Sequence, residues 1–234
     1  MNNLPEIDME EELFIGPTEH LRADIPPEPR EHYVEVLKSA GRISDVMTAL
    51  LALTGLSRAE RALKRERLTR ELAEQFIGDM RLLISTKYEN LAGGHLVAEG
   101  AYCESVGDYV GAAWLYRAAI DFKIEDRKAA YYRFNNLGFC LNYLRCFKEA
   151  LEVLEKAMEK EPKAYNAFKN AGVAYEHMGK TDLAAKAYMD AINYSAGESR
   201  CIKHLLRLVA RNPGLKQDKI VVSYLTSLRE HGKI

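Results

Sequence analysis

The chain has 234 residues, of which 47% are apolar and 29% are charged, so it can bury a substantial core. A formal net charge of −1 and a pI near 6.6 give no global field that would attract nucleic acid or anionic lipid. No apolar run approaches the length of a membrane span, and we expect neither nucleic acid nor a membrane as the partner.

The four cysteines show no metal-ligand spacing, and we expect no secretory leader before them. Small buried thiols in helices are the expected state. We therefore expect a cytoplasmic location, in a reducing compartment. The four cysteines are Cys103, Cys140, Cys146 and Cys201.

Residues 1–30 carry eight acidic side chains against Arg22 and Arg30, together with several prolines. A segment of this composition buries too little apolar surface to offset the entropy of ordering. We therefore expect a flexible acidic arm.

Residues 31–92 are predicted to form an N-terminal helical region, because apolar residues recur at three- and four-residue spacing. A break is expected at Gly41, and Ser57 is expected to cap a long helix that runs to residue 83. One face of that helix carries a stripe of apolar side chains, namely Leu68, Leu72, Phe76, Met80 and Leu83.

The first turns of the same helix are strongly basic. Residues 58–70 contain six cationic side chains and only two acidic ones, Glu60 and Glu66. A solvated surface explains them, and so does docking of the acidic arm or of an acidic partner. The sequence leaves both interpretations open for Arg58, Arg61, Lys64, Arg65, Arg67 and Arg70.

An internal repeat of 34 residues follows. Residues 131–164 and 165–198 align without a gap, and a third unit, residues 93–126, precedes them after a spacer of four residues. The spacer, residues 127–130, suggests a lengthened second helix or turn. The aligned positions are Phe134 with Phe168, Leu137 with Ala171, Gly138 with Gly172, Ala150 with Ala184, Leu154 with Tyr188, and Ala157 with Ala191, and the third unit has Gly100, Ala112, Tyr116 and Ala119 at corresponding places.

This pattern, which ends the second unit with Pro162, resembles the tetratricopeptide repeat. The resemblance implies an all-α fold: a tetratricopeptide-type helical-hairpin solenoid over residues 93–198, with the additional N-terminal helices and with C-terminal capping helices in residues 199–234. It also implies that Gly138 and Gly172 let the two helices of a hairpin approach closely. The sequence departs from the family in lacking a tryptophan at the first apolar place and in ending the last unit with Ala196.

No catalytic constellation is recognisable. The six histidines form no paired ligand set, and neither a phosphate-binding glycine loop nor a nucleophile elbow occurs. We expect no enzyme activity, no metal and no cofactor.

The resemblance implies that the first helix of each hairpin lines a concave groove. The groove is amide-rich in the middle and basic toward its C-terminal end, so amides would hold the main chain of an extended peptide and the cations an acidic side chain or terminal carboxylate. Ordinary solvated helix surface is the alternative. The predicted groove residues are Tyr132, Asn135, Asn136, Phe139, Asn142, Asn166, Lys169, Asn170, Val173, Arg200, Lys203 and Arg207.

Two features refine the groove prediction. Asn136 and Asn170 recur at one equivalent place, and we expect both to be accessible and dispensable for folding. Relatives that clamp a C-terminal carboxylate would need a lysine and an asparagine where Val97 and Ala101 stand. A full clamp for chaperone tails is therefore not expected.

The sequence thus predicts a non-catalytic interaction module that binds a peptide segment of another protein. One alternative is a self-assembling scaffold, which an exposed stripe around Leu68, Leu72 and Phe76 would favour. A second alternative is a chaperone that holds a secretion substrate in the same groove.

Overall fold

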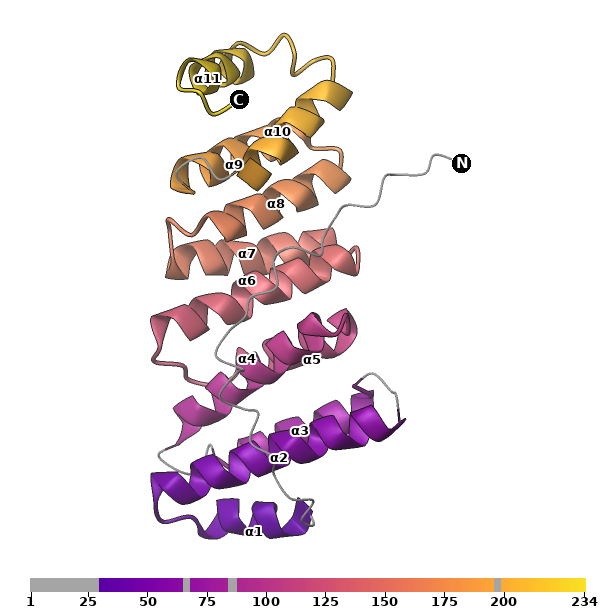
Figure 1. Cartoon of the computed structure of the whole chain (residues 1–234), viewed down its shortest axis with the longest axis vertical. Helices are drawn as coiled ribbons and strands as arrows, with labels where there is room; N and C mark the ends of the chain where they lie inside the picture. The colour runs from indigo at the N-terminus through magenta and orange to yellow at the C-terminus, as the bar shows by residue number, and fades with distance from the viewer. Residues whose placement is uncertain (1–29, 65–67, 84–87, 196–198) are drawn as a thin grey trace. The chain divides into compact units, whose positions relative to one another are not determined.

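The computed structural model describes residues 30–64, 68–83, 88–195 and 199–234, and every regular element within these ranges is an α-helix (Figure 1). The all-helical prediction is confirmed. The chain divides into two compact units, Met1–Phe122 (unit 1) and Lys123–Ile234 (unit 2). The predicted arm lies outside the described residues except for Arg30.

Unit 1 holds the helices that precede the repeats and the first predicted hairpin. The break at Gly41 is confirmed, but the predicted helix start at Ser57 is wrong, because the helical periodicity continues through that residue. The next helix starts after Thr69, whose side chain accepts a hydrogen bond from Leu72 N at 3.3 Å. The helices are α1 (Arg30–Ser39), α2 (Ile43–Lys64), α3 (Arg70–Arg81), α4 (Glu89–Ser105) and α5 (Tyr109–Ala119).

The apolar stripe of residues 68–83 is part of the core of unit 1. Leu68 and Phe76 are each 4% exposed, and Met80 and Leu83 are fully buried. α3 packs against both α4 and α5. Leu72 is the one half-buried residue of the stripe, so the stripe does not form the exposed apolar surface that would favour self-assembly. Self-assembly itself stays untested.

Asp108 connects two parts of unit 1. It caps α5 by accepting a hydrogen bond from Gly111 N at 3.0 Å, and its other carboxylate oxygen accepts one from Leu68 N at 2.7 Å. The residue is only 3% exposed. Its carboxylate thus fixes the chain just before α3 against the start of α5.

Unit 2 contains two complete hairpins followed by two further helices. α6 pairs with α7, α8 pairs with α9, and neighbouring hairpins contact each other through α6, α7 and α8. The spacer residues 127–130 form the first turn of α6, capped by Asp126, rather than a longer second helix. The helices are α6 (Arg127–Tyr143), α7 (Phe147–Lys160), α8 (Tyr165–His177), α9 (Thr181–Tyr194), α10 (Ser199–Arg211) and α11 (Lys219–Glu230).

Each hairpin brings a glycine of its first helix against a large side chain of its second. A Cβ on Gly100 would lie 2.8 Å from Tyr116 Cε1, and one on Gly138 would lie 2.5 Å from Leu154 Cγ. A Cβ on Gly172 would overlap the ring of Tyr188. The close approach predicted for Gly138 and Gly172 is confirmed, and Gly100 makes the same contact in the first hairpin.

The turns of the three hairpins share a left-handed residue. Gly107 has φ 76°, Arg145 has φ 63° and Gly179 has φ 71°. These residues stand at equivalent places in the repeat. The turn geometry is therefore kept even where an arginine, which is strained in this conformation, replaces glycine.

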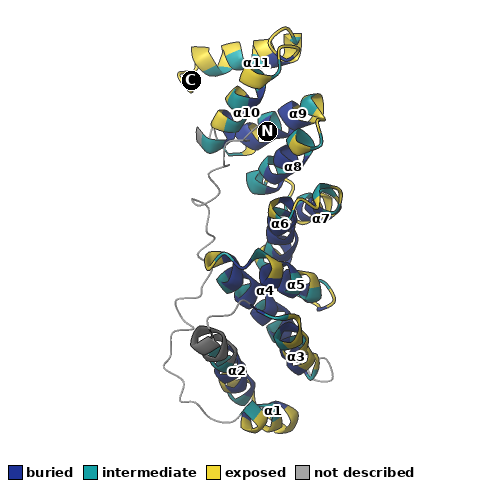
Figure 2. Cartoon of the chain, turned by 90° about the vertical axis from the view of Figure 1, so that its right-hand side faces the viewer, coloured by how far each residue is buried: buried dark blue, intermediate teal, exposed yellow. Residues whose placement is uncertain are grey.

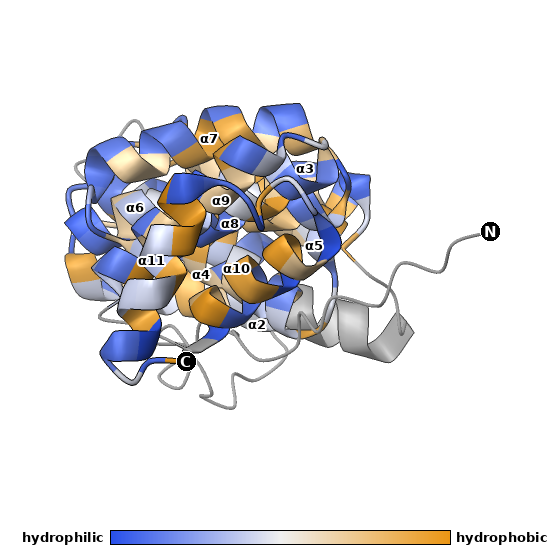
Figure 3. Ribbon diagram, turned by 90° about the horizontal axis from the view of Figure 1, so that it is seen from above, coloured by the Kyte–Doolittle hydropathy of each residue, from blue (hydrophilic) through white to orange (hydrophobic). Residues whose placement is uncertain are grey.

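The second helices are amphipathic, and α7 shows this most plainly, with alternating hydrophilic and hydrophobic segments (Figure 3). Its Ala150 and Leu154 are fully buried. The first helices α4 and α6 differ, because they are buried or half-buried over nearly their whole length and exposed only near their ends (Figure 2). The core therefore runs between the helices of each hairpin and between successive hairpins.

The C-terminal helices continue the core of unit 2. α10 buries Cys201, Leu205 and Leu208 against α9. The hydroxyl of Tyr224 on α11 has two acceptors within reach of its one proton, Asn193 Oδ1 at 2.8 Å and Met189 O at 3.2 Å. Both capping helices predicted for residues 199–234 are present.

We predict that Gly172→Ala lowers the free energy of unfolding by about 1 to 3 kcal/mol, because the added methyl group overlaps Tyr188. Gly94→Ala is the matched control, since Gly94 lies within α4 and a Cβ there meets nothing within 4 Å. The control should gain up to about 1 kcal/mol from helix propensity. Urea titrations measure both, and equal effects would contradict the hairpin register.

Burial raises the pKa of the Glu104 carboxyl to about 7, although the hydrogen bond that it accepts from Tyr116 OH at 2.9 Å opposes the shift. Between a pH of about 4.5 and about 7, the Glu104 carboxyl is therefore protonated in the folded chain and ionised in the unfolded chain, where its pKa is 4.5. We predict that the free energy of unfolding falls by about 2 to 3 kcal/mol as the pH rises from about 4.5 to about 7.

Glu104→Gln should flatten this pH dependence, and Glu71→Gln, at an exposed glutamate of α3, should keep it. Denaturation at a series of pH values measures the slopes. An unchanged slope in Glu104→Gln would refute the assignment.

Candidate peptide-binding face

The first helices of unit 2, α6, α8 and α10, carry every residue predicted to line the groove. α6 and α8 contact each other directly, and α10 packs against α9. The structure sorts these residues into three classes. Lys203 is exposed; Tyr132, Phe139, Asn166, Lys169, Arg200 and Arg207 are half-buried; Asn135, Asn136, Asn142, Asn170 and Val173 are buried.

Val173 belongs to the core of unit 2. It is 7% exposed and clusters with Ala184, Tyr188 and Leu205. This position therefore differs from the groove-lining place that we expected, because the side chain points between helices.

Three of the buried asparagines link α6 to α8. Asn142 Nδ2 donates to Asn170 O at 2.8 Å, and Asn170 Nδ2 donates to Asn135 Oδ1 at 3.3 Å. Within α6, Asn135 Nδ2 donates to Asn136 Oδ1 at 2.9 Å. Asparagine is a poor helix former, and this network gives a structural reason for its density here.

The network changes the interpretation of Asn136 and Asn170. They are 4% and 5% exposed, whereas we expected accessible amides that are dispensable for folding. Asn170 Nδ2 donates a hydrogen bond to Asn135 Oδ1 of α6. Direct contact of these two residues with a ligand stays a prediction.

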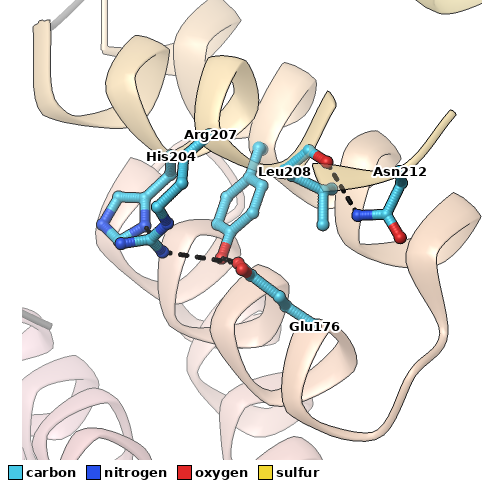
Figure 4. A network of polar contacts seen from close by, with 6 residues as sticks. Glu176, His204, Arg207, Leu208 and Asn212 are labelled. Atoms are coloured by element: carbon cyan, nitrogen blue, oxygen red, sulfur yellow. Dashed lines mark hydrogen bonds and ion pairs between the residues drawn. The ribbon is translucent and has the colours of Figure 1, made fainter. Parts of the chain in front are cut away.

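A second polar cluster joins α8, α9 and α10 (Figure 4). Glu176 Oε2 accepts a hydrogen bond from Tyr188 OH at 2.8 Å and lies 3.5 Å from Arg207 Nη2. Arg207 Nη2 also lies 3.0 Å from His204 Nδ1, which must accept because a guanidinium has only donors. His204 stacks on Tyr188 with ring centroids 5.2 Å apart.

This cluster changes the charge available on the predicted face. Arg207 is paired with Glu176 inside the protein, so it is less able to hold a ligand carboxylate than we expected. Burial, followed by the neighbouring Glu176, raises the pKa of Tyr188 well above its ordinary value, so the phenol stays a donor. Of the other predicted cations, Lys203 is exposed, and Lys169 and Arg200 are half-buried.

The sequence contained a signal for this cluster that we did not use. Glu176 and Tyr188 are twelve residues apart, and so are Glu104 and Tyr116, which form the same hydrogen bond in the first hairpin. The pairs stand at equivalent places of their repeats. The hairpin between them has Asn142 there instead, and this residue bonds to α8.

The cysteines differ from the expectation at one position. Cys103, Cys140 and Cys201 are buried, but Cys146 is exposed because it stands at the cap of α7, in the turn of its hairpin. Among residues 30–64, 68–83, 88–195 and 199–234, no group of three His, Cys, Asp or Glu could hold a metal ion. In the same ranges no helix is long and apolar enough to cross a bilayer.

Comparison with solved structures agrees with the hairpin geometry. A crystal structure of MamA protein matches with a TM-score of 0.52 and 18% identity, covering 77% of this chain and 93% of that one. A second crystal structure of MamA gives 0.50 and 17%, covering 72% and 95%. The fold is that of the tetratricopeptide repeats.

A third structure, MamA 41-end from Desulfovibrio magneticus RS-1, gives a TM-score of 0.49 at 20% identity and covers 76% of this chain and 94% of that one. At these identities the likeness concerns the fold alone. No family model and no curated protein matches the sequence. The crystal structures with TM-scores of 0.50 and 0.52 confirm, at the level of fold, the tetratricopeptide resemblance predicted from residues 93–198.

We predict that Asn170→Ala lowers the free energy of unfolding by about 1 to 2 kcal/mol, because the enclosed Asn135 Oδ1 loses its donor from α8. Asn166→Ala is the control, since its half-buried side chain has an enclosed oxygen that accepts no hydrogen bond within the described part of the chain. That variant should stay within about 0.5 kcal/mol of the parent. Thermal and urea unfolding compare them, and a neutral Asn170→Ala would show that the network does not stabilise the fold.

Proposed function

We propose that the chain is a non-catalytic interaction module that binds a segment of another protein along α6, α8 and α10. The observation that carries the proposal is a set of cations on α8 and α10: Lys169 and Arg200 are half-buried, and Lys203 is exposed. α6 adds two half-buried rings to the proposed face, those of Tyr132 and Phe139. Folds of this kind present surfaces more often than reactive centres, which supports a function without catalysis.

The charge of unit 2 supports an acidic partner. Residues 123–234 contain 20 Lys or Arg and 13 Asp or Glu, a formal charge of +7, although the whole chain carries −1. A field of this sign raises the rate at which an acidic segment arrives. Lysine and arginine would then form charge-assisted hydrogen bonds with its carboxylates.

The buried amides have a supporting part in this proposal. The network from Asn135 to Asn170 fixes α6 against α8. The residues of the proposed face on these two helices therefore keep their spacing before a ligand binds. A preorganised surface loses less entropy on binding. A cytoplasmic location is part of the proposal, and the three buried thiols are compatible with it.

The test uses two variants with the same change of charge. Lys169→Glu with Lys203→Glu alters the proposed face, and Lys156→Glu with Lys186→Glu alters exposed residues of the second helices α7 and α9. Partners are captured from native lysate by the parent chain, identified by mass spectrometry and titrated calorimetrically. We predict that the first variant weakens binding by about 1 to 3 kcal/mol, in a way that salt reduces, and that the second leaves it unchanged.

Equal affinity of the two variants for the captured partner would contradict the proposed face. Weakening only by the α7 and α9 variant would move the binding surface to the second helices. Circular dichroism of each variant verifies that the helices remain.

A further inference from the structure

The positive charge of unit 2 is concentrated in its last two helices. Residues 199–234 contain eight Lys or Arg and two Asp or Glu, a formal charge of +6. Residues 123–198 contain twelve and eleven, a formal charge of +1. The segment that forms α10, the following turn and α11 therefore holds nearly all of the +7 of unit 2. We call residues 199–234 the C-terminal cap.

Most cations of the C-terminal cap are exposed and are not neutralised by unit 2. Arg207 is held by Glu176, but five exposed cations form no ion pair with another described residue. Helix α7 differs, because its three lysines are intermixed with four glutamates. The cap therefore presents a positive field to an incoming segment. The five exposed cations are Lys203, Arg211, Lys216, Lys219 and Arg229.

Three of these cations lie around the turn between α10 and α11. Arg211 ends α10, Lys219 begins α11, and Lys216 lies in the turn between them. Asp218 is the one acidic residue of this turn, and its Oδ1 caps α11 by accepting hydrogen bonds from two backbone N–H groups, both at 2.9 Å. Glu230 lies at the other end of α11. Arg211, Lys216 and Lys219, the basic cluster, therefore keep a surplus of positive charge.

Exposed apolar surface adjoins the basic cluster. Ile220 directly follows Lys219 and is 71% exposed, and Val222 is 42% exposed. The core side of α11 is formed instead by Val221 and Tyr224. Cations beside exposed aliphatic side chains suit a segment that carries both carboxylates and apolar residues.

Residues 1–29 of the same chain have that composition. Eight carboxylates and Arg22 give them a formal charge of −7, and three glutamates at positions 10–12 directly precede Leu, Phe and Ile at positions 13–15. Residues 30–122 carry only −1, because the whole chain carries −1 and unit 2 carries +7. Within that range residues 58–70 are basic, but Arg70 already pairs with Glu74 at 2.8 Å. The C-terminal cap is therefore the better electrostatic match for the arm.

The arm is long enough to extend beyond unit 1. Arg30 forms an ion pair with Asp79 of α3, so the preceding residues start from that point. The eighteen residues from position 13 to position 30 span up to about 59 Å when extended, at about 3.3 Å each. A compact unit of about 100 residues has a radius of gyration of only about 13 Å.

We propose that residues 10–15 dock on the C-terminal cap of their own chain, with the three glutamates at the basic cluster and the apolar residues at Ile220. The docking surface lies wholly within unit 2. Charge-assisted hydrogen bonds hold the carboxylates, and the covalent tether raises the local concentration of the arm. A docked arm keeps other acidic molecules away from this surface. The proposal does not rest on the proposed face, because the basic cluster lies outside it.

Cleavage by trypsin after Arg22 measures docking in the full chain without any partner. The test variant is Lys216→Glu with Lys219→Glu, and a glutamate in the first turn of α11 suits the helix dipole. The matched control, Lys156→Glu with Lys186→Glu, makes the same charge change at exposed residues of α7 and α9. If the parent arm is docked nine-tenths of the time, cleavage should be about ten-fold faster in the test variant and unchanged in the control. Added salt should also speed cleavage of the parent.

A zero-length carbodiimide cross-link locates the arm, because it joins a carboxylate to an amine that it touches. Mass spectrometry of the parent should find links from residues 10–12 to Lys216 or Lys219. Leu13→Ser with Phe14→Ser should reduce these links and speed cleavage after Arg22. Its control, Leu21→Ser with Ile25→Ser, should match the parent.

Equal cleavage rates in the parent and in Lys216→Glu with Lys219→Glu would overturn the proposal. Cross-links from residues 10–12 only to Lys64 would place the arm on the basic stretch of unit 1, and links only to Lys169 or Lys203 would place it on the proposed face; either result would overturn it. A cleavage rate that rises as the parent is diluted would mean an arm from a second copy and would overturn it as well.

Discussion

The contact between a glycine of the first helix and a large side chain of the second sets the geometry of each hairpin. Gly100, Gly138 and Gly172 meet Tyr116, Leu154 and Tyr188 so closely that no Cβ fits between them. Because the two helices are this close, the second helix needs small residues such as alanine where it meets the first, since a larger side chain would separate the helices. The turn is constrained as well, which explains why Arg145 accepts the left-handed conformation that Gly107 and Gly179 adopt.

The same packing decides which polar residues remain available to a partner. Close hairpins bring α6 against α8, so amides that a helical wheel places on the groove are used between helices. Arg207 is likewise held by Glu176. The predicted face also has half-buried rings on α6, half-buried cations on α8 and α10, and the exposed Lys203, in a unit that carries a formal charge of +7. Specificity for an acidic segment would arise from these side chains, over a floor that the buried amides make rigid.

Sequence reasoning succeeded where one local rule dominates. The repeat register rests on glycine and alanine at fixed spacing, and the break at Gly41 rests on glycine alone. It failed where several local choices compete or where the outcome depends on a neighbouring hairpin. Ser57 can cap a helix or continue one, and the surrounding apolar pattern continued it. The partners of Asn142 and Asn170 lie 28 and 35 residues away, so no local pattern reveals that these amides are buried.

The central claim is that a partner lies along the first helices of unit 2. A photo-reactive amino acid in place of Lys203 on α10, compared with one in place of Lys156 on α7, tests it most directly, because both side chains are exposed and the helices differ in their place in the hairpin. The account predicts a covalent adduct with the partner from position 203 and none from position 156. Adducts from position 156 alone, or equally from both, would contradict it.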